Sequence, residues 1–311
     1  MPDTQPPLLI VSRNLPPVVG GIERLMHRLV EGLAAGRPCT VIGPRGARAH
    51  LPASVRLIEL PHRPAVLFVG LAWVLVGMLC LRERFGAVLA GNGLMRLAAA
   101  TPLRRCPVVT MVYGLDIIAP HALYQALCLP LIARSAAVIA CSSNSARMAA
   151  ERGVPAERLH AVTPGVDMPA GPAARDASHT GGPLIVSVGR LVRRKGLAEF
   201  VGRALPGILQ RFPSARFLVI GEDPAAALKR EGSESARIRH AAEEAGVQSK
   251  VELAGYLDDA ALARAMAAAS VHVFPVLDLP GDVEGFGLVA LEAAAHGVPT
   301  VTFDAGGVRD A

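Results

Sequence analysis

The chain is poor in aromatic residues, which make up 4% of its 311 residues, although 51% of those residues are hydrophobic. Its cores must therefore consist mainly of alanine, leucine and valine. The five cysteines form no C-x-x-C pair and their number is odd. This argues against a disulfide framework and favours reduced thiols in a cytoplasmic protein. No basic region followed by a long apolar run opens the chain, so we expect no secretory signal.

Lysine is also scarce, with three residues, and basic residues are not interleaved with aromatic ones. This pattern argues against a nucleic-acid partner. The formal net charge of +6 nevertheless favours an anionic partner, such as a nucleotide sugar or an acidic lipid surface. The excess of arginine over lysine can equally reflect genome composition.

Two motifs of common metal and cofactor sites are missing. No Asp-x-Asp pair occurs, so the sequence offers no carboxylate clamp for a divalent cation. No G-x-G-x-x-G follows the first expected strand of either half, which argues against a dinucleotide-dependent enzyme. We therefore expect neither a metal nor a separate cofactor.

Short apolar strands alternate with helical segments along the chain. We expect strands at 8–11, 40–42, 55–60, 87–89, 108–112 and 137–140, and then at 184–188, 217–220, 251–253, 271–274 and 300–303. Such alternation predicts parallel sheets with helices on both faces. Residues 169–183 are small and polar without periodicity, which is typical of a linker. The sequence thus predicts an α/β protein with two Rossmann-like domains, 1–168 and 184–311, facing each other across a cleft.

One apolar segment has three open interpretations. Residues Ala65 to Leu81 carry no charge over seventeen positions. They fall where the fold needs a helix, which favours a buried scaffold helix. Shallow docking on a membrane face is the second interpretation, and a membrane span, for which the segment is barely long enough, is the third.

Two glutamates, Glu284 and Glu292, flank a glycine-rich turn that opens an apolar run. The run from Leu288 predicts a buried helix. Gly285 and Gly287 would lie at its start, where free N–H groups and the helix dipole favour an anion. Both carboxylates could then accept hydrogen bonds from sugar or ribose hydroxyls. The alternative is an ordinary helix with an acidic start.

Basic residues and a second glycine turn offer further phosphate contacts. Arg190 and Lys195 follow the strand at 184–188, and a guanidinium and an ammonium both bind phosphate oxygens. Their neighbours Arg193 and Arg194 are better explained as a solvated basic loop. Gly20 and Gly21 precede an expected helix and could present backbone N–H groups to the same diphosphate, or could simply form a tight turn.

Four segments, in the expected order, resemble motifs of the family-four retaining glycosyltransferases, enzymes of the GT-B fold. They are the glycine loop at 16–21, the segments at 153–155 and 163–167, the arginine–lysine segment at 189–196, and the paired-glutamate motif at 284–293. The similarity runs from about Leu8 to Asp310. In that family the motif at 306–311 is followed by several dozen more residues, so the resemblance implies a truncated chain and an incomplete second domain.

The resemblance implies transfer of a sugar from a nucleotide diphosphate-sugar, with retention of configuration and without a metal. Catalytic roles would fall to Glu284, Arg190 and Lys195. Donor contacts would come from Gly20, Gly21, Arg190, Lys195, Glu284, Gly285, Phe286, Gly287, Leu288 and Glu292.

Tyr113 departs from the family pattern, which often has histidine there in contact with the donor sugar. A tyrosine hydroxyl can still form a hydrogen bond but cannot carry positive charge, so this role does not transfer simply. Asp116 either orients the acceptor or caps the following helix.

The leading hypothesis is a bacterial glycosyltransferase that builds a polysaccharide or glycolipid. Its partners would be a nucleotide-sugar donor and a glycan or lipid-linked acceptor, with peripheral contact at the inner face of the membrane. The alternative is a catalytically silent nucleotide-sugar-binding module.

Overall fold

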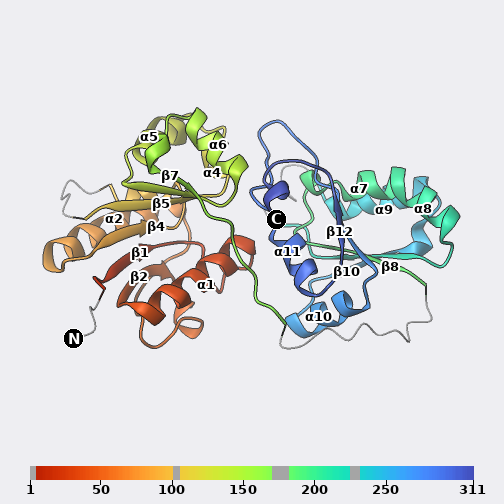
Figure 1. Cartoon of the computed structure of the whole chain (residues 1–311), viewed down its shortest axis with the longest axis horizontal. Coiled ribbons are helices and arrows are strands. Elements are labelled where there is room, and N and C mark those ends of the chain that lie inside the picture. The colour runs from red at the N-terminus through yellow and green to blue at the C-terminus, as the bar shows by residue number, and fades with distance from the viewer. Residues whose placement is uncertain (1–4, 101–105, 170–181, 225–231) are drawn as a thin grey trace. The chain divides into compact units, whose positions relative to one another are not determined.

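The computed structural model describes residues 5–100, 106–169, 182–224 and 232–311. The chain divides into two compact units, Met1–Pro164 and Gly165–Ala311 (Figure 1). Most of the predicted linker at 169–183 lies outside the described residues. Both units are α/β folds built on a parallel sheet, as the alternation of strands and helices predicts.

The first unit contains a seven-stranded sheet in the order β3-β2-β1-β4-β5-β6-β7, and all its strand pairs are parallel. The strands are β1 (Leu8–Val11), β2 (Cys39–Pro44), β3 (Arg56–Leu60), β4 (Ala87–Ala90), β5 (Val108–Val112), β6 (Ala137–Ala140) and β7 (Leu159–Ala161). The sequence did not predict β7, an edge strand of three residues with too little apolar character to form a recognisable run.

The helices of this unit are α1 (Gly21–Gly36), α2 (Ala65–Arg82), α3 (Met95–Ala98), α4 (Leu115–Ile118), α5 (Ala122–Ala133) and α6 (Ser143–Glu151). The chain moves from β1 outward to β3, then crosses back to β4 and continues to β7. Because parallel crossovers are right-handed, this reversal places α1 on one face and α2, α3 and α5 on the other.

Helix α2 is buried along one stripe only. Phe68, Ala72, Val76 and Leu79 pack into the core formed with β1 and β4. The opposite stripe is also apolar but exposed. Only 28% of the helix is buried, and among the described residues it is the one helix long and apolar enough to cross a membrane. The expectation of a buried scaffold helix therefore holds for one face and is wrong for the other.

The second unit contains a five-stranded parallel sheet in the order β10-β9-β8-β11-β12. Its strands are β8 (Leu184–Val188), β9 (Arg216–Ile220), β10 (Val251–Gly255), β11 (Val271–Phe274) and β12 (Thr300–Thr302). Its helices are α7 (Leu197–Glu199), α8 (Leu205–Arg211), α9 (Glu234–Glu244), α10 (Asp259–Ala268) and α11 (Leu288–Ala295).

A π-helical turn, Phe200–Ala204, separates α7 from α8. Pro206 accounts for the interruption, because its nitrogen cannot donate to the carbonyl of Gly202 and its ring crowds that carbonyl. Around this turn, Val201 and Leu205 are fully buried in the core beside β9.

Candidate functional site

Lys195 lies at the carboxyl edge of the second sheet, in the loop that follows β8. This loop forms a 3-10 turn, Arg193–Lys195, that ends at Gly196. Gly196 has a φ of 64°, and a Cβ there would lie 2.1 Å from the carbonyl oxygen of Pro275. Glycine is thus required for the β8 loop to pack this closely on the loop that follows β11.

The centre of the site is a cluster of buried ion pairs. The Lys195 ammonium donates to Glu284 Oε2 at 2.8 Å, and Arg194 Nε donates to the same oxygen at 3.1 Å. Arg194 Nη1 also donates to Asp282 Oδ1 at 3.0 Å. Lys195 Nζ lies 4.3 Å from the centre of the Phe274 ring, a cation–π contact. Ion pairs therefore join the loops that follow β8 and β11, two neighbouring strands of the sheet.

Burial and charge oppose each other within this cluster. Burial lowers the pKa of Lys195, and the charge of Glu284 offsets part of that effect. Burial would raise the pKa of Glu284, but the charges of Lys195 and Arg194 outweigh it and hold that pKa below its usual value. The carboxylate is therefore ionised at neutral pH.

His272 lies beneath the cluster on β11. Its ring stacks on Phe274 with centroids 6.0 Å apart, and its Nδ1 lies 3.1 Å from Thr300 Oγ1. His272 Nε2 is buried with no hydrogen-bond partner in the part of the chain that the structure describes. Burial, aided by the charge of Lys195, lowers the pKa of His272 to about 4. The imidazole is therefore neutral at neutral pH, and no third positive charge is added.

The loop after β12 holds the backbone of Glu284. The Gly307 N–H donates to the Glu284 carbonyl at 2.8 Å. Gly306 has a φ of 60°, and a Cβ there would lie 2.5 Å from the same carbonyl oxygen. The glycine pair in the 306–311 motif thus fixes the position of the Glu284 backbone at the carboxyl edge of the sheet.

Helix α11 begins at Leu288, where the paired-glutamate motif predicts it. Its N-cap, Gly287, is left-handed with a φ of 100°, and no side chain caps the first turn. Phe286 is buried, and Glu292 is half-buried in the second turn. A bound anion could therefore accept hydrogen bonds from backbone N–H groups at this helix start, which lies a few residues from Glu284 in the sequence.

The burial of the basic residues in the loop after β8 differs from the prediction. Arg190 and Arg193 are exposed, whereas Arg194 is buried with Lys195. The assignment of Arg194 to a solvated loop was therefore wrong. A single sequence does not reveal that the 3-10 turn directs Arg194 inward and leaves Arg193 outside.

At the carboxyl edge of the first sheet, Gly20 and Gly21 lie at the start of α1. The Glu23 carboxylate closes over this turn, since a Cβ on Gly20 would lie 2.2 Å from Glu23 Oε2. Asn14 Nδ2 donates to Glu23 Oε1 at 2.7 Å, and Asn92 Nδ2 donates to Asn14 Oδ1 at 2.6 Å. The predicted anion-binding turn thus carries a carboxylate of the chain itself.

Tyr113 and Asp116 take up mainly internal contacts. The Tyr113 hydroxyl is buried and donates to Met111 Sδ at 3.6 Å. Asp116 accepts from the Tyr113 N–H at 2.8 Å and the Gly93 N–H at 3.1 Å. Burial raises the pKa of Asp116, and these backbone donors moderate the rise. Asp116 thus ties the loops after β4 and β5 together, a contact that neither of its predicted roles includes.

Several polar residues of the two carboxyl edges were missed by the sequence analysis, namely Asn14, Glu23, Asn92, Arg194 and Asp282. Asn14 and Asn92 follow the buried strands β1 and β4 within three residues. Position directly after a buried strand was therefore the available signal.

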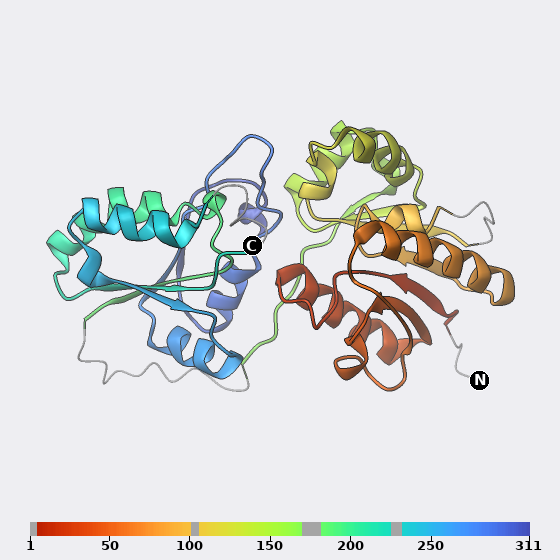
Figure 2. The ribbon, with the colours of Figure 1, turned by 180° about the vertical axis from the view of Figure 1, so that it is seen from behind.

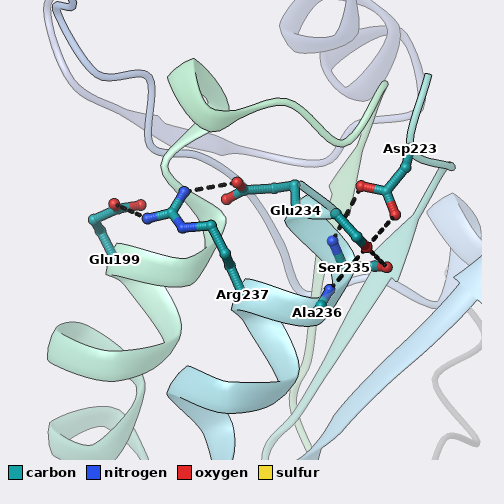
Figure 3. A network of polar contacts seen from close by, with 7 residues as sticks. Glu199, Asp223, Glu234, Ser235, Ala236 and Arg237 are labelled. Carbon is teal, nitrogen blue, oxygen red and sulfur yellow. Dashed lines mark hydrogen bonds and ion pairs between the residues drawn. The ribbon is translucent and has the colours of Figure 1, made fainter. Parts of the chain in front are cut away.

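Beside the ion-pair cluster, the second unit has a pocket of about 580 Å³ whose lining includes Arg193, Asp282, Glu234 and Arg237. Arg237 bridges Glu234 at 2.7 Å and Glu199 at 2.9 Å (Figure 3). These ion pairs join the start of α9 to α7 along one wall of the pocket.

The same end of α9 is held by a second set of contacts. Asp223 accepts from the Ser235 N–H at 3.2 Å and from the Ser233 hydroxyl at 2.9 Å (Figure 3). Ser233 in turn caps α9 by accepting from the Ala236 N–H. The loop after β9 and the start of α9 therefore form one connected polar wall.

Comparison with solved structures defines the fold class. Sucrose-phosphate synthase from Thermosynechococcus elongatus superposes with a TM-score of 0.77 at 20% identity, covering 98% of this chain and 83% of that one. The Anabaena protein HepE, crystallised with UDP and glucose, superposes with a TM-score of 0.74 at 19% identity, covering 98% of this chain and 83% of HepE. At these identities the likeness concerns the fold alone, and it is the GT-B glycosyltransferase fold of two parallel-sheet α/β domains.

Sequence comparison defines the family. The model described as Glycosyltransferase Family 4 matches residues 19–168, and the model described as Glycosyl transferases group 1 matches residues 174–311. The chain therefore belongs to the family-four, group 1 glycosyltransferases.

Two curated relatives show how far the similarity extends. Glycogen synthase of Mycobacterium tuberculosis is 30% identical over 182 residues, which are 58% of this chain and 40% of that protein. A GDP-mannose-dependent phosphatidylinositol monomannoside mannosyltransferase of Mycolicibacterium smegmatis is 28% identical over 97% of this chain and 82% of that protein. The chain thus spans about two-fifths of the first relative and most of the second.

Proposed function

We propose that this protein is a retaining glycosyltransferase that moves a sugar from a nucleotide diphosphate-sugar to a glycan or lipid-linked acceptor without a metal. The observation that carries the proposal is the buried Lys195–Glu284–Arg194 cluster close in sequence to the uncapped start of α11. It combines cationic side chains with a helix N-terminus that no side chain caps, and both features can bind a diphosphate.

The cationic side chains would stabilise the departing nucleoside diphosphate. Lys195 is preorganised by Glu284 and Phe274, so its ammonium needs little rearrangement as charge develops on the leaving oxygen. Arg190 is exposed in the same loop and would provide a two-point contact to phosphate oxygens. Arg194 would act indirectly, by holding Glu284.

The two glutamates would bind the two ends of the donor. Glu284, held through its backbone by Gly307, would accept hydrogen bonds from the transferred sugar. Glu292, in the second turn of α11, would accept from the ribose hydroxyls. Retention would follow from front-face displacement, in which the leaving phosphate accepts the acceptor's proton. This stereochemistry rests on family membership.

Relatives support the choice of donor and acceptor class. HepE was crystallised with UDP and glucose, and the mannosyltransferase from Mycolicibacterium smegmatis is named for GDP-mannose and a phosphatidylinositol glycolipid. A cytoplasmic enzyme working at the inner face of a bacterial membrane fits these chemistries.

A silent nucleotide-sugar-binding module is the second candidate, and the buried Tyr113 favours it. The hydroxyl that would have to contact the donor sugar instead donates to Met111 Sδ. Binding of a donor without turnover would support this alternative.

The test begins with thermal unfolding of the purified protein against UDP-, GDP- and TDP-sugars. We expect one nucleotide to raise the unfolding temperature, and we expect slow donor hydrolysis with that sugar. EDTA should leave both results unchanged. Absence of any shift across the panel would contradict the proposal.

Two variants and a matched control locate the site. Glu292→Ala should weaken donor binding about tenfold, as expected for the loss of charge-assisted hydrogen bonds. Glu284→Ala should mainly slow transfer. Glu252→Gln, an exposed change on β10, is the control and should behave like wild type. Wild-type kinetics in both site variants would contradict the assignment.

A further inference from the structure

Helix α2 presents an exposed stripe of large apolar side chains that no fold requirement explains. Leu67, Leu71, Val74, Met78 and Leu81 recur at helical spacing on the side opposite the core, and all are exposed. Figure 2 shows α2, in orange, lying along the outside of its sheet. A continuous apolar stripe facing water on a globular unit usually marks a contact surface.

Helix α5 extends the apolar character of the same face. Its Leu123 and Leu127, one turn apart, are exposed at 62% and 46%. The strand order places α5 on the side of the sheet that α2 covers, and α3 packs against both helices. The apolar surface therefore extends beyond a single helix.

Exposed arginines lie at both ends of α2. Arg63 lies just before α2, and Arg82 and Arg84 lie at and after its end, all of them exposed. Neither α2 nor α5 contains an acidic residue.

We propose that the exposed faces of α2 and α5 form a docking surface for a bilayer containing anionic lipids, with α2 lying in the plane of the interface. The apolar stripe would enter the headgroup and acyl boundary, and the flanking arginines would contact lipid phosphates. This inference stands on the surface of the first unit and does not depend on the proposed donor chemistry.

A membrane span is excluded by the way α2 is built into the fold. The helix connects β3 to β4 within one sheet, and its inner stripe fills the core. Spanning would require Phe68, Ala72, Val76 and Leu79 to leave that core, with loss of the packing that holds the unit together. Docking in the plane uses only side chains that are already exposed.

The chain contains a natural reporter for this surface. Trp73, its single tryptophan, lies on α2, is 44% exposed, and donates its indole N–H to the Ala100 carbonyl at 3.2 Å. Tryptophan emission in the unmodified protein therefore reports directly on contact between α2 and lipid.

The first experiment mixes the wild-type protein with vesicles of phosphatidylcholine alone and with vesicles containing about 30% of the anionic lipid phosphatidylglycerol. We expect sedimentation with the anionic vesicles, weakened by salt, and a blue shift of Trp73 emission. Lipids brominated on their acyl chains should quench that emission. Failure to bind anionic vesicles, or binding without quenching, would overturn the proposal.

The second experiment compares two triple variants. Leu71, Val74 and Met78 changed to Gln should reduce vesicle partitioning about tenfold or more, because three apolar side chains are lost from the stripe. Val162, Phe212 and Val301 changed to Gln, similarly exposed but outside α2 and α5, should bind like wild type. Equal binding by the two variants would contradict the assignment to α2.

A third variant separates charge from apolar contact. Changing Arg63, Arg82 and Arg84 to Gln should reduce binding to anionic vesicles about fivefold per arginine and leave binding to phosphatidylcholine unchanged. Sedimentation equilibrium tests whether the surface instead binds a second copy of the chain. Self-association that the α2 variant abolishes, without vesicle binding by wild type, would assign the surface to a second copy of the chain instead.

Discussion

Asp116 in the first unit and Glu284 in the second are both carboxylates held at the carboxyl edge of a parallel sheet, but they are compensated differently. Asp116 is bound by backbone N–H groups of Tyr113 and Gly93, and its pKa is raised by burial. Glu284 is bound by two cations, and its pKa is lowered. One edge is organised by neutral donors and the other by charge.

The difference indicates which edge is built for an anionic ligand. Neutral donors satisfy the hydrogen bonds of Asp116 but bring no positive charge to the first edge. At the second edge, Glu284 and Asp282 formally balance Lys195 and Arg194. The exposed Arg190 and Arg193 of the same loop then leave an excess of positive charge. A diphosphate would therefore be attracted to the second edge, while the first edge is better suited to neutral groups such as hydroxyls.

The largest effect is expected from Glu284→Gln. It leaves Lys195 and Arg194 buried without a full countercharge, which should lower the free energy of unfolding by about 3 kcal/mol. Sugar transfer should slow about 100-fold, as for loss of a key preorganised group. Urea unfolding and steady-state kinetics measure both effects. A variant that unfolds and reacts like wild type would show that the charge pairing is incidental.

His272 sharpens the comparison through pH. Its folded pKa, about 4, lies below the ordinary value of 6.5, so its neutral form contributes stability that is complete above 6.5. That stability should be lost as pH falls toward 4, by about 3 kcal/mol in total. His272→Asn, which keeps a polar group facing Thr300, should remove this dependence. The unfolding free energies of wild type and His272→Asn at pH 7 and 5 test this. An equal change with pH in the two proteins would contradict the prediction.

Gly306→Ala tests whether the backbone support of Glu284 matters. It introduces both a left-handed alanine and a clash with the Glu284 carbonyl, and should cost about 2–3 kcal/mol and reduce transfer. Gly297→Ala is the matched control, with a φ of 70° and no atom within 4 Å of a new Cβ. It should cost about 1 kcal/mol and leave transfer intact. Equal losses of stability in the two variants would mean that the backbone easily relieves the clash between a new Cβ at position 306 and the Glu284 carbonyl.

Asp116→Asn probes the other edge and should cost about 1–2 kcal/mol, because an amide can accept only one of the two backbone donors. The loss of stability in Asp116→Asn and the loss of stability in Glu284→Gln should change with pH in opposite directions. Asp116 contributes stability below its ordinary pKa of 3.8 and loses it as pH rises through its higher folded value, so the deficit of Asp116→Asn should grow on acidification.

Glu284 contributes stability above its ordinary pKa of 4.5 and loses it as pH falls through its lower folded value, so the deficit of Glu284→Gln should shrink. Unfolding of both variants at pH 7 and near pH 4 checks the contrast. Shifts in the same direction would remove the distinction between the two edges.

The smallest effect is expected from Tyr113→Phe. It removes only a weak hydrogen bond to Met111 Sδ, so stability should change by less than about 1 kcal/mol and transfer by less than about threefold. Donor affinity and the transfer rate measure the effect. A large loss would mean that the hydroxyl reaches the sugar after all, and the two edges would then share the donor.

Local pattern predicted much of this protein. The alternation of apolar strands with helices predicted both parallel sheets, because the period of hydrophobic residues depends on near neighbours. The glycine-rich turn before Leu288 predicted the start of α11 for a similar reason, since a left-handed residue such as Gly287 favours glycine. The edge strand β7 was missed, because Leu159-His160-Ala161 has too little apolar character to form a recognisable run.

The sequence by itself therefore determined the secondary-structure order, the family motifs and the charge balance, all of which depend on residue type and short-range spacing. Only the tertiary structure decided that Arg194 is buried against Glu284, ninety positions away, while Arg193 faces solvent. It also decided that half of the apolar helix α2 is left outside the core. Burial and ion pairing depend on which distant segments the fold brings together, and residue type alone does not specify that.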